Sequence, residues 1–360
     1  MRILRMEVVH LAMPLSQPYT IAYERIAHVD NLLVRLVTDG PHVGLGISAP
    51  DVGVTGETLS AARDALRDVV EPLIVGSDPL RRAVVLEALD QALPKQPSVR
   101  ACIDMALHDL LGKIAGVPVW RMLGGYRDRM VTSVTLGITG VEPAVARALE
   151  FMGDGFQVLK LKGGLDVERD IEVVLAVRAA VGPHIELRFD ANQGYDAEMA
   201  HAFHLRAAAA DLSMIEQPTP ASALGELRKV TRSVALPVMA DESVLSLADA
   251  FLFARGDAMD MINLKLVKVG GLDAALLING VARAAGLEVM VGCMDEAELS
   301  IASGLAFALS RPNVEFADLD GHFDLLNDPT VGCVHLEAGV LFPSDAPGFG
   351  LADVPDSAAV

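Results

Sequence analysis

The sequence is poor in cysteine and in aromatic residues. Its 360 residues include three cysteines and one tryptophan, and only 4% are aromatic. Cys102, Cys293 and Cys333 are widely spaced, odd in number and never arranged as a CxxC pair. This pattern indicates neither a disulfide framework nor a structural zinc site.

Positive charge is also scarce, with 29 Lys and Arg against 48 Asp and Glu and a formal net charge of −19. Such a surface repels phosphate backbones and anionic lipids, so we expect no nucleic-acid or membrane partner. No apolar run approaches the roughly 20 residues that span a bilayer. The start, MRILRMEVVHLAMPL, has no long apolar core and no small-residue cleavage site. We therefore expect a cytoplasmic protein. We also expect a homo-oligomer.

The order of patterns along the chain predicts three parts. Residues 1–124 begin with the alternating apolar positions of strands and then become helical, which predicts an α+β domain. Ser98 is the expected N-cap of its clearest helix, in SVRACIDMALHDLLGKIAG. Residues 125–320 form the second part. Residues 321–360, punctuated by Gly and Pro, are expected to pack back on the first domain.

A Gly-rich stretch in the first part, GLGISA, has the form of a dinucleotide-binding GxGxxA motif. Pro50 and Asp51 follow it, where the motif requires a helix. The strand–turn–helix context is therefore missing, and we discard a dinucleotide site.

The second part alternates strand-like and Ala-rich helical segments at a spacing of about 22–29 residues. Such alternation implies a parallel sheet, and eight units of this size fit a closed α/β barrel. Seven of the eight strands are followed by a helical segment. The expected strands are residues 131–138, 157–164, 185–192, 211–218, 237–243, 260–268, 288–296 and 314–320.

The second of these strands, VLKLKGG, carries two lysines. Lys160 and Lys162 point to the same face, because side chains alternate along a strand. A solvated face on an edge strand is one interpretation, since lysines are common on edge strands. A functional interpretation rests on the other strand ends, where an α/β barrel places its chemistry. Those ends carry Asp190 and Asn192, Glu216, Asp241 and Glu242, Asn263 and Lys265, Asp295 and Glu296, and Asp318 and Asp320.

Three acids on three successive strands, Asp190, Glu216 and Asp241, would converge at the barrel mouth. A single acid at a strand end is most often a helix N-cap or a solvated loop residue. Three converging carboxylates repel one another unless a cation lies between them. Oxygen ligands with room for water and substrate suit Mg²⁺. The sequence therefore predicts a magnesium site.

The lysines then have a chemical interpretation. Lys162 and Lys265 come from opposite sides of an eight-stranded ring, so one can remove a proton from a substrate and the other can return it to the opposite face. A divalent metal and the like-charged Lys160 would favour the neutral form of Lys162, which a general base requires. Lys268 comes three residues after Lys265, so in a continuous strand its side chain would point to the opposite face. It is therefore predicted to be a solvent or turn residue.

The motifs LKLKGG, FDANQ, IEQP, MADES and INLKLVKVGG, in this order, resemble those of the enolase superfamily, in its muconate-lactonizing branch and among its dipeptide epimerases. The resemblance covers nearly the whole chain. It implies a modified (β/α)7β barrel under an N-terminal capping domain. It also implies that Asp190, Glu216 and Asp241 bind Mg²⁺, which stabilises an enediolate formed from the substrate carboxylate, and that Lys162 and Lys265 are the acid/base pair.

The resemblance extends to ADLDG, where Asp318 and Asp320 would take the terminal ammonium of a dipeptide. Racemases of N-acylamino acids, cycloisomerases and o-succinylbenzoate synthases are the alternatives within the superfamily. The racemases and the synthases need no ammonium partner, so the acid pair argues against them.

The substrate's side chains are predicted from charge. The stretch PYTIAYERI resembles a capping loop that reaches over the barrel mouth, with Glu24 where relatives acting on Ala-Glu carry an arginine. Glu24, Asp51, Asp295 and Glu296 would attract a basic side chain and repel an acidic one. Arg25 leaves an alternative, because a shift of one residue in register would present a cation and favour Ala-Glu.

Two other classes of function are weighed against the epimerase. A Schiff-base aldolase is also a barrel with an inward lysine, but it has no use for three metal-binding acids. A non-catalytic small-molecule binder would not need both lysines and all three acids.

Overall fold

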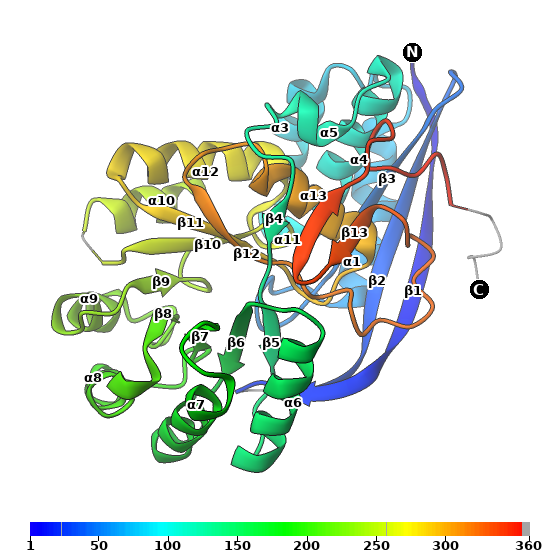
Figure 1. Ribbon diagram of the computed structural model, residues 1–360. Helices are drawn as coiled ribbons and strands as arrows, with labels where there is room; N and C mark the ends of the chain where they lie inside the picture. Colours follow the sequence, from blue (N-terminus) through cyan, green and yellow to red (C-terminus); the bar gives the residue numbers. More distant parts are fainter. Residues whose placement is uncertain (23, 257, 355–360) are drawn as a thin grey trace.

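The computed structural model describes residues 1–22, 24–256 and 258–354. Figure 1 shows an antiparallel sheet with its helices on one side of the molecule and a barrel of strands ringed by helices on the other. No helix of the described ranges is both long and apolar enough to cross a membrane.

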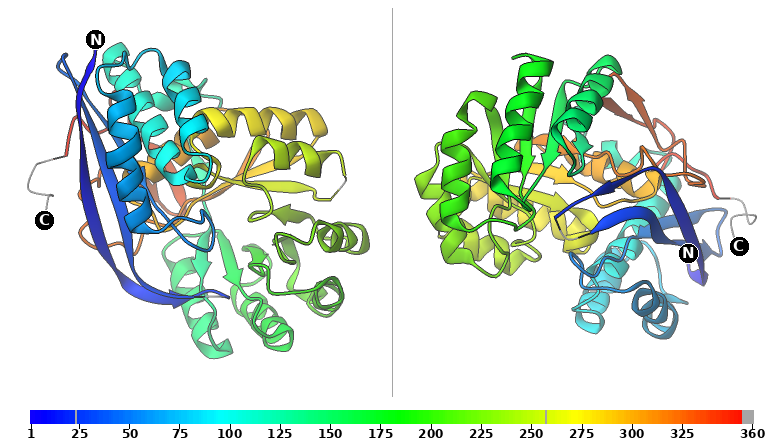
Figure 2. Two further views of the ribbon diagram at one scale, coloured as in Figure 1. Left: turned by 180° about the vertical axis from the view of Figure 1, so that it is seen from behind. Right: turned by 90° about the horizontal axis from the view of Figure 1, so that it is seen from below.

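The N-terminal domain is a three-stranded antiparallel sheet covered on one face by helices (Figure 2). Gly44 and Gly46 of the GLGISA stretch lie in its third strand, where an added Cβ would overlap the backbone carbonyls of Ala106 and Cys102 in the long helix α4. These glycines therefore serve close helix–sheet packing. The elements are β1 (Ile3–Thr20), β2 (Arg25–Thr38), β3 (Val43–Ser48), α1 (Leu59–Ala65), η1 (Leu66–Val70), α2 (Glu71–Ile74), α3 (Arg82–Ala92), α4 (Pro97–Ala115) and α5 (Val119–Met122).

Helix α4 does not begin as the sequence predicts. Its N-cap is Gln96, and Ser98 lies inside the first turn, where its hydroxyl pairs with that of Ser48 at 2.8 Å. The free backbone N–H groups of the first turn are met by Glu57, which accepts from the nitrogens of Ser98 at 3.0 Å and Val99 at 3.4 Å. A distant carboxylate thus caps the positive end of the helix in place of a local hydroxyl.

Eight parallel strands form the barrel, and they confirm the predicted fold. Their order is β12-β11-β10-β9-β8-β7-β6-β5. The two end strands meet through Ser133, whose nitrogen donates to the oxygen of Ala317 at 3.1 Å and whose hydroxyl donates to Asp318 at 2.6 Å. The strands are β5 (Val134–Leu136), β6 (Val158–Lys162), β7 (Glu186–Asp190), β8 (Leu212–Glu216), β9 (Val238–Ala240), β10 (Met261–Lys265), β11 (Glu288–Gly292) and β12 (Val314–Asp318).

Helices surround the barrel strands on the outside (Figure 2). They are α6 (Val141–Gly153), α7 (Val167–Val181), α8 (Ala197–Arg206), η2 (Ala208–Ala210), α9 (Leu224–Ser233), α10 (Leu247–Ala254), α11 (Leu266–Val269), α12 (Leu272–Ala285) and α13 (Glu298–Ala308). Strand β6 pairs with β5 on one side and β7 on the other. The edge-strand interpretation of Lys160 and Lys162 is therefore wrong.

The lower part of the barrel interior is mainly apolar, although the buried Arg188 of β7 also contacts Met290 there. Met214, Met239, Met261 and Met290, from four neighbouring strands, pack together with Phe316. Strand alternation puts the side chains two and four residues further on at the same inner face but nearer the carboxyl ends of the strands. The charged residues of the site thus lie above a layer of methionines.

The chain after the barrel forms a small sheet and then returns to the N-terminal domain. Strands β13 (Val334–Glu337) and β14 (Val340–Pro343) pair with β4 (Met130–Val131). Further on, the nitrogen of Phe349 donates to Asp109 of α4 at 2.9 Å, and Lys113 of α4 donates to the oxygen of Ala352 at 3.1 Å. The described part of the tail is thus held by α4.

The two glycines of VLKLKGG bring the turn after β6 against the turn after β7. An added Cβ on Gly164, whose φ is +101°, would overlap the carbonyl oxygen of Ala191. The nitrogen of Gly164 donates to Asp170 at 2.8 Å, and Asp170 also accepts from the hydroxyl of Tyr195 at 2.6 Å. Because Lys162 is two residues before Gly164, this turn fixes where β6 ends.

We expect Gly164→Ala to lower the free energy of unfolding by about 3 kcal/mol, since it adds both a steric overlap and an unfavourable positive φ. Gly286→Ala is the control, because Gly286 also has a positive φ of 74° but has open space around its Cβ. It should cost about 1 kcal/mol. Urea unfolding measures both, and equal losses would contradict the steric argument.

Candidate active site

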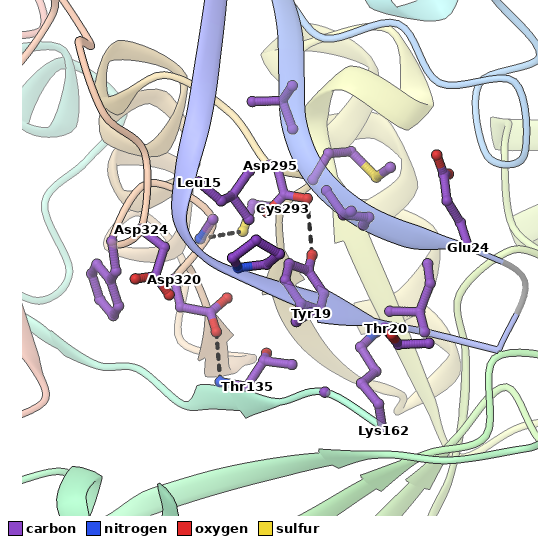
Figure 3. Close-up of a pocket in the computed structure, with 18 of the residues that line it drawn as sticks. Leu15, Tyr19, Thr20, Glu24, Thr135, Lys162, Cys293, Asp295, Asp320 and Asp324 are labelled. Carbon is purple, nitrogen blue, oxygen red and sulfur yellow. Dashed lines mark hydrogen bonds between the residues drawn. The ribbon is translucent and has the colours of Figure 1, made fainter. Parts of the chain in front are cut away.

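A cavity of about 910 Å³ lies between the N-terminal domain and the mouth of the barrel. Its wall combines residues of the loop between β1 and β2, residues 49–59, and the carboxyl ends of the barrel strands. Figure 3 shows the end of β1 crossing this mouth above Lys162 and Asp320. The cavity thus stands where the sequence places the chemistry of a barrel.

The three predicted metal ligands are buried at the mouth. Asp190 ends β7, Glu216 ends β8, and Asp241 follows β9, and each is at most 2% exposed. Lys160 stands between two of them, with its Nζ 3.2 Å from Asp190 and 2.8 Å from Glu216. Ammonium groups therefore separate the like charges in this structure.

The acids differ in the balance of burial and neighbouring charge. Burial acts to raise the pKa of Asp190, but Lys162 and Lys160 outweigh it and hold the pKa below its usual value. Burial, with the charge of Asp190, raises the pKa of Glu216 to about 7. At Asp241 burial is outweighed by Lys265 and Lys268, and the pKa is lowered. The lysines thus favour the charged forms of Asp190 and Asp241, whereas burial dominates at Glu216.

Two buried oxygens at the mouth, Asn192 Oδ1 and Glu242 Oε2, have no hydrogen-bond donor among the described residues. Asp241 Oδ2 lies beside them and faces the ammonium of Lys265 at 2.9 Å. Buried acceptors normally have a donor, so an unsatisfied set of hard oxygens fits a hard divalent cation. The donors present are thus suited to Mg²⁺.

The lysines predicted as acid and base face the cavity from opposite sides. Lys162 ends β6 and Lys265 ends β10, which are four strands apart in the eight-strand order, and both line the cavity. Lys162 donates to Asp190 at 2.7 Å. Burial acts to lower the pKa of Lys265, but Asp241 outweighs it and the pKa lies well above the usual value.

Lys160 lies deeper than Lys162 and is 1% exposed. Its ammonium is 2.7 Å from Asp318, in addition to its contacts with Asp190 and Glu216. Burial acts to lower the pKa of Lys160, but these three carboxylates outweigh it and raise the pKa well above the usual value. Lys160 is therefore a fixed positive charge in this site.

The prediction that Lys268 is a solvent or turn residue is wrong. Its side chain is fully buried, and its Nζ donates to the side chain and the backbone oxygen of Asp241, both at 2.6 Å, and to the oxygen of Asn263 at 2.9 Å. The argument from strand alternation fails because the strand ends at Lys265 and the one-turn helix α11 begins. A residue three positions along a helix returns to the same side.

The acid pair of ADLDG lies at the end of β12, and both members line the cavity. Asp318 is fully engaged, because its two oxygens accept from Ser133 at 2.6 Å and from Lys160 at 2.7 Å. Asp320 accepts from the backbone nitrogen of Thr135 at 2.7 Å (Figure 3). Burial, with the charge of Asp318, raises the pKa of Asp320 to about 7.

A second acidic group lies outside the cavity, where α4 meets the start of α12. The ligand atoms of Asp104, His108 and Asp273 lie within 4.8 Å of one another. His108 Nδ1 is 3.1 Å from Asp104 and its Nε2 is 3.5 Å from Asp273. Each ring nitrogen thus faces its own carboxylate, and the imidazolium supplies the positive charge that a metal ion would otherwise bring. Burial acts to lower the pKa of His108, but Asp104 outweighs it and the pKa is raised.

Comparison with known proteins places this architecture in one family. Residues 3–124 match the mandelate racemase / muconate lactonizing enzyme N-terminal domain, and residues 144–356 match the enolase C-terminal domain-like family. Two relatives named L-Lys-D/L-Arg epimerase, from Desulforapulum autotrophicum and Methylococcus capsulatus, are 38% and 40% identical. Each match covers 94% of this chain and 95% of the relative. The chain belongs to the dipeptide epimerases of the enolase superfamily.

Solved structures of this family superpose closely on the chain. The substrate-liganded L-Ala-D/L-Glu epimerase from Bacillus subtilis has a TM-score of 0.96 at 33% identity, with 99% of this chain and 100% of that chain covered. The dipeptide epimerase from Methylococcus capsulatus, complexed with Mg and L-Arg-D-Lys, has a TM-score of 0.92 at 38% identity, with 98% and 100% covered.

Within this family, the N-terminal domain is the capping domain. Glu24 is exposed and lines the cavity, whereas Arg25 is exposed but does not line it. Asp51 lines the cavity too, although one oxygen accepts from the nitrogen of Val54 at 2.7 Å and so shapes its own loop. The capping loops thus bring two carboxylates, and not the cation of Arg25, to the cavity wall.

The two acids after β11 are placed differently from each other. Asp295 lines the cavity and accepts from the hydroxyl of Tyr19 at 2.8 Å. Glu296 does not line it, because its carboxylate turns back to the nitrogen of Met294 at 2.6 Å and to the hydroxyl of Ser300. The expectation that Glu296 faces a substrate therefore does not agree with its placement.

Other cavity residues received no role in the sequence analysis. Glu242 and Asn192 line the cavity, and their side chains are 3.4 Å apart. Both stand at predicted strand ends, but alternation alone did not separate them from their neighbours. Tyr19 lies in the quoted capping loop, and no local pattern distinguishes it.

Lys268→Met should lower the free energy of unfolding by about 3–5 kcal/mol, because it leaves the buried carboxylate of Asp241 without a partner on one side. Urea unfolding of the metal-free protein measures this loss. Lys229→Met is the control, since Lys229 pairs with Glu226 on the exposed face of α9 and should leave the unfolding midpoint unchanged. Wild-type stability of Lys268→Met would contradict the assignment.

Proposed function

We propose that the protein is a Mg²⁺-dependent dipeptide epimerase that inverts the α-carbon next to the C-terminal carboxylate. The observation that carries this proposal is the placement of Lys162 and Lys265 on opposite sides of one cavity, next to three buried carboxylates. Two bases on opposite faces are what inversion of a carbon centre requires, because the proton leaves one face and returns to the other.

Asp190, Glu216 and Asp241 would hold one Mg²⁺. The oxygen-only set of these three carboxylates, with the unpaired oxygens of Asn192 and Glu242 beside it, supports this assignment. When bound, the cation supplies positive charge that stabilises the negative charge developing on the substrate carboxylate. The solved relatives from Methylococcus capsulatus and Enterococcus faecalis are complexed with Mg and a dipeptide, which supports the same metal here.

Proton transfer would take place at the Nζ atoms of Lys162 and Lys265. For one enantiomer the neutral amine of one lysine accepts the α-proton and the ammonium of the other donates a proton, and for the other enantiomer the roles exchange. Lys160 keeps its proton, because three carboxylates surround it, and it acts through its charge.

The terminal ammonium of the dipeptide would bind Asp320. Asp318 is already paired with Lys160 and Ser133, so its main effect is to hold the local charge negative. Asp320 is anchored by one backbone donor from Thr135 and retains capacity for a substrate ammonium. Such an ion pair favours a dipeptide over an N-acylated amino acid, which has no ammonium.

We further propose a preference for dipeptides with a basic side chain. Glu24, Asp51 and Asp295 lie on the cavity wall, and Arg25 does not. Two relatives at 38% and 40% identity carry the name L-Lys-D/L-Arg epimerase, which supports the same preference. The alternative, Ala-Glu, would place a carboxylate near these three acids.

The two-base assignment is tested by deuterium exchange. We expect Lys162→Ala and Lys265→Ala each to lose epimerisation, while each still exchanges the α-proton of one enantiomer in deuterated water and the two variants prefer opposite enantiomers. Mass spectrometry reads the exchange. Lys229→Ala, on the outer face of α9, is the control. Epimerisation near the wild-type rate in either lysine variant would overturn the mechanism.

Substrate charge is tested by kcat/KM for Lys- and Arg-containing dipeptides against Ala-Glu. We expect a preference of at least roughly 100-fold for the basic dipeptides, because like charges meeting in a desolvated cleft cost several kcal/mol. Glu24→Gln and Asp51→Asn should each reduce this ratio, whereas Glu172→Gln, exposed on α7, should not. A preference for Ala-Glu would overturn the charge assignment but leave the epimerase intact.

A further inference from the structure

A hydrogen bond between two side chains joins the capping domain to the barrel at the cavity wall. The hydroxyl of Tyr19, near the end of β1, donates to Asp295 Oδ2 at 2.8 Å, and Asp295 follows β11 (Figure 3). Both residues line the cavity. The contact therefore couples the position of a capping strand to the orientation of an acid that faces the substrate space.

The backbones on both sides of this contact are held independently of it. Asn31 of β2 donates to the oxygen of Asp295 at 3.3 Å and accepts from the nitrogen of Ala297 at 2.9 Å. These bonds fix the backbone of the loop after β11 and involve no side-chain atom of Asp295. Among the described residues, only Tyr19 donates a hydrogen bond to that carboxylate.

Tyr19 is itself seated on the barrel. The next residue, Thr20, accepts through its backbone oxygen from the nitrogen of Ile138 at 2.7 Å. An added Cβ on Gly137 would lie 2.9 Å from Tyr19 Cβ, so the strand end packs directly on the loop after β5. The hydroxyl is thus presented from a fixed backbone.

We infer that Tyr19 is a positioning residue for substrate charge, which pins one oxygen of Asp295 and turns the other toward the cationic side chain of a dipeptide. The inference rests on the proposed function. An acceptor held in place loses less freedom when it binds its partner, so a preorganised carboxylate binds a cation more tightly than a mobile one.

The surroundings of Asp295 are consistent with this role. Burial raises the pKa of Asp295 to about 6, while the bond from Tyr19 and the charges of Lys162 and Lys265 act to lower it and Glu296 acts to raise it. Because this pKa lies below neutrality, the carboxylate carries its negative charge at neutral pH and loses it as the pH falls through about 6. Attraction for a cationic side chain should be lost with it.

The test compares Tyr19→Phe with wild type on an Arg-Lys dipeptide and on the neutral Ala-Ala. In Tyr19→Phe we expect KM for Arg-Lys to rise roughly tenfold relative to KM for Ala-Ala, because one hydrogen bond to a charged group is lost. In an Asp295→Asn background, Tyr19→Phe should have no further effect on this ratio. Tyr126→Phe, an exposed tyrosine outside the cavity wall, is the control.

A pH profile separates positioning from general loss of structure. The fall of kcat/KM for Arg-Lys at low pH should move to higher pH in Tyr19→Phe, since the bond that lowers the pKa of Asp295 is gone. Ala-Ala should show no such shift. An equal rise of KM for both dipeptides, or a change of the ratio that persists in Asp295→Asn, would overturn the inference.

Calorimetric binding of the same two dipeptides to the Mg²⁺-loaded protein makes the comparison without turnover. Tighter binding of Arg-Lys that weakens in Tyr19→Phe supports the inference even where turnover is slow. Binding of Arg-Lys with no weakening in Tyr19→Phe counts against the inference alone. Failure of wild type to bind or epimerise either dipeptide counts against the proposed function and removes the inference with it.

Discussion

Charge balance inside the barrel mouth is the constraint on which the other features of this protein depend. Asp190, Glu216 and Asp241 are buried at the ends of three successive strands, and burying a carboxylate without a partner costs several kcal/mol. Lys160 and Lys268 offset this cost from positions that no solvent reaches. Below these groups lie the buried methionines and Arg188, so the charges are met by other side chains inside the barrel and not by solvent.

The two lysines of VLKLKGG differ in role because they lie at different depths in the barrel. Side chains two residues apart share a face but differ in position by roughly 7 Å along the strand. Lys160 is enclosed by carboxylates and remains a fixed charge, whereas Lys162 reaches the cavity. The turn at Gly164 ends the strand just beyond, because only glycine tolerates that approach to Ala191. The local sequence therefore determines which lysine lies deep in the barrel and which one lies at the cavity.

In the function we propose, the capping domain contributes recognition and the barrel contributes the chemistry. Glu24 and Asp51 come from capping loops and Asp295 from a barrel loop, and all three line the same cavity. Loops on a rigid scaffold are suited to this division, since they change shape and charge without disturbing the strands that hold the acids. Tyr19 links the two domains, because it belongs to the capping domain and donates a hydrogen bond to Asp295 of the barrel.

The sequence by itself determined the barrel, since alternation of strands and helices requires a parallel sheet, and it brought Asp190, Glu216 and Asp241 to one rim, because parallel strands end at one side. Only the tertiary structure decided the places of Lys268, Glu296 and Tyr19. Lys268 is buried because strand geometry changes to helix geometry at Lys265. Glu296 turns away and Tyr19 turns inward because of partners that alternation along one strand does not specify. Local periodicity fixes the face on which a side chain lies, while its partners depend on contacts between segments far apart in the chain.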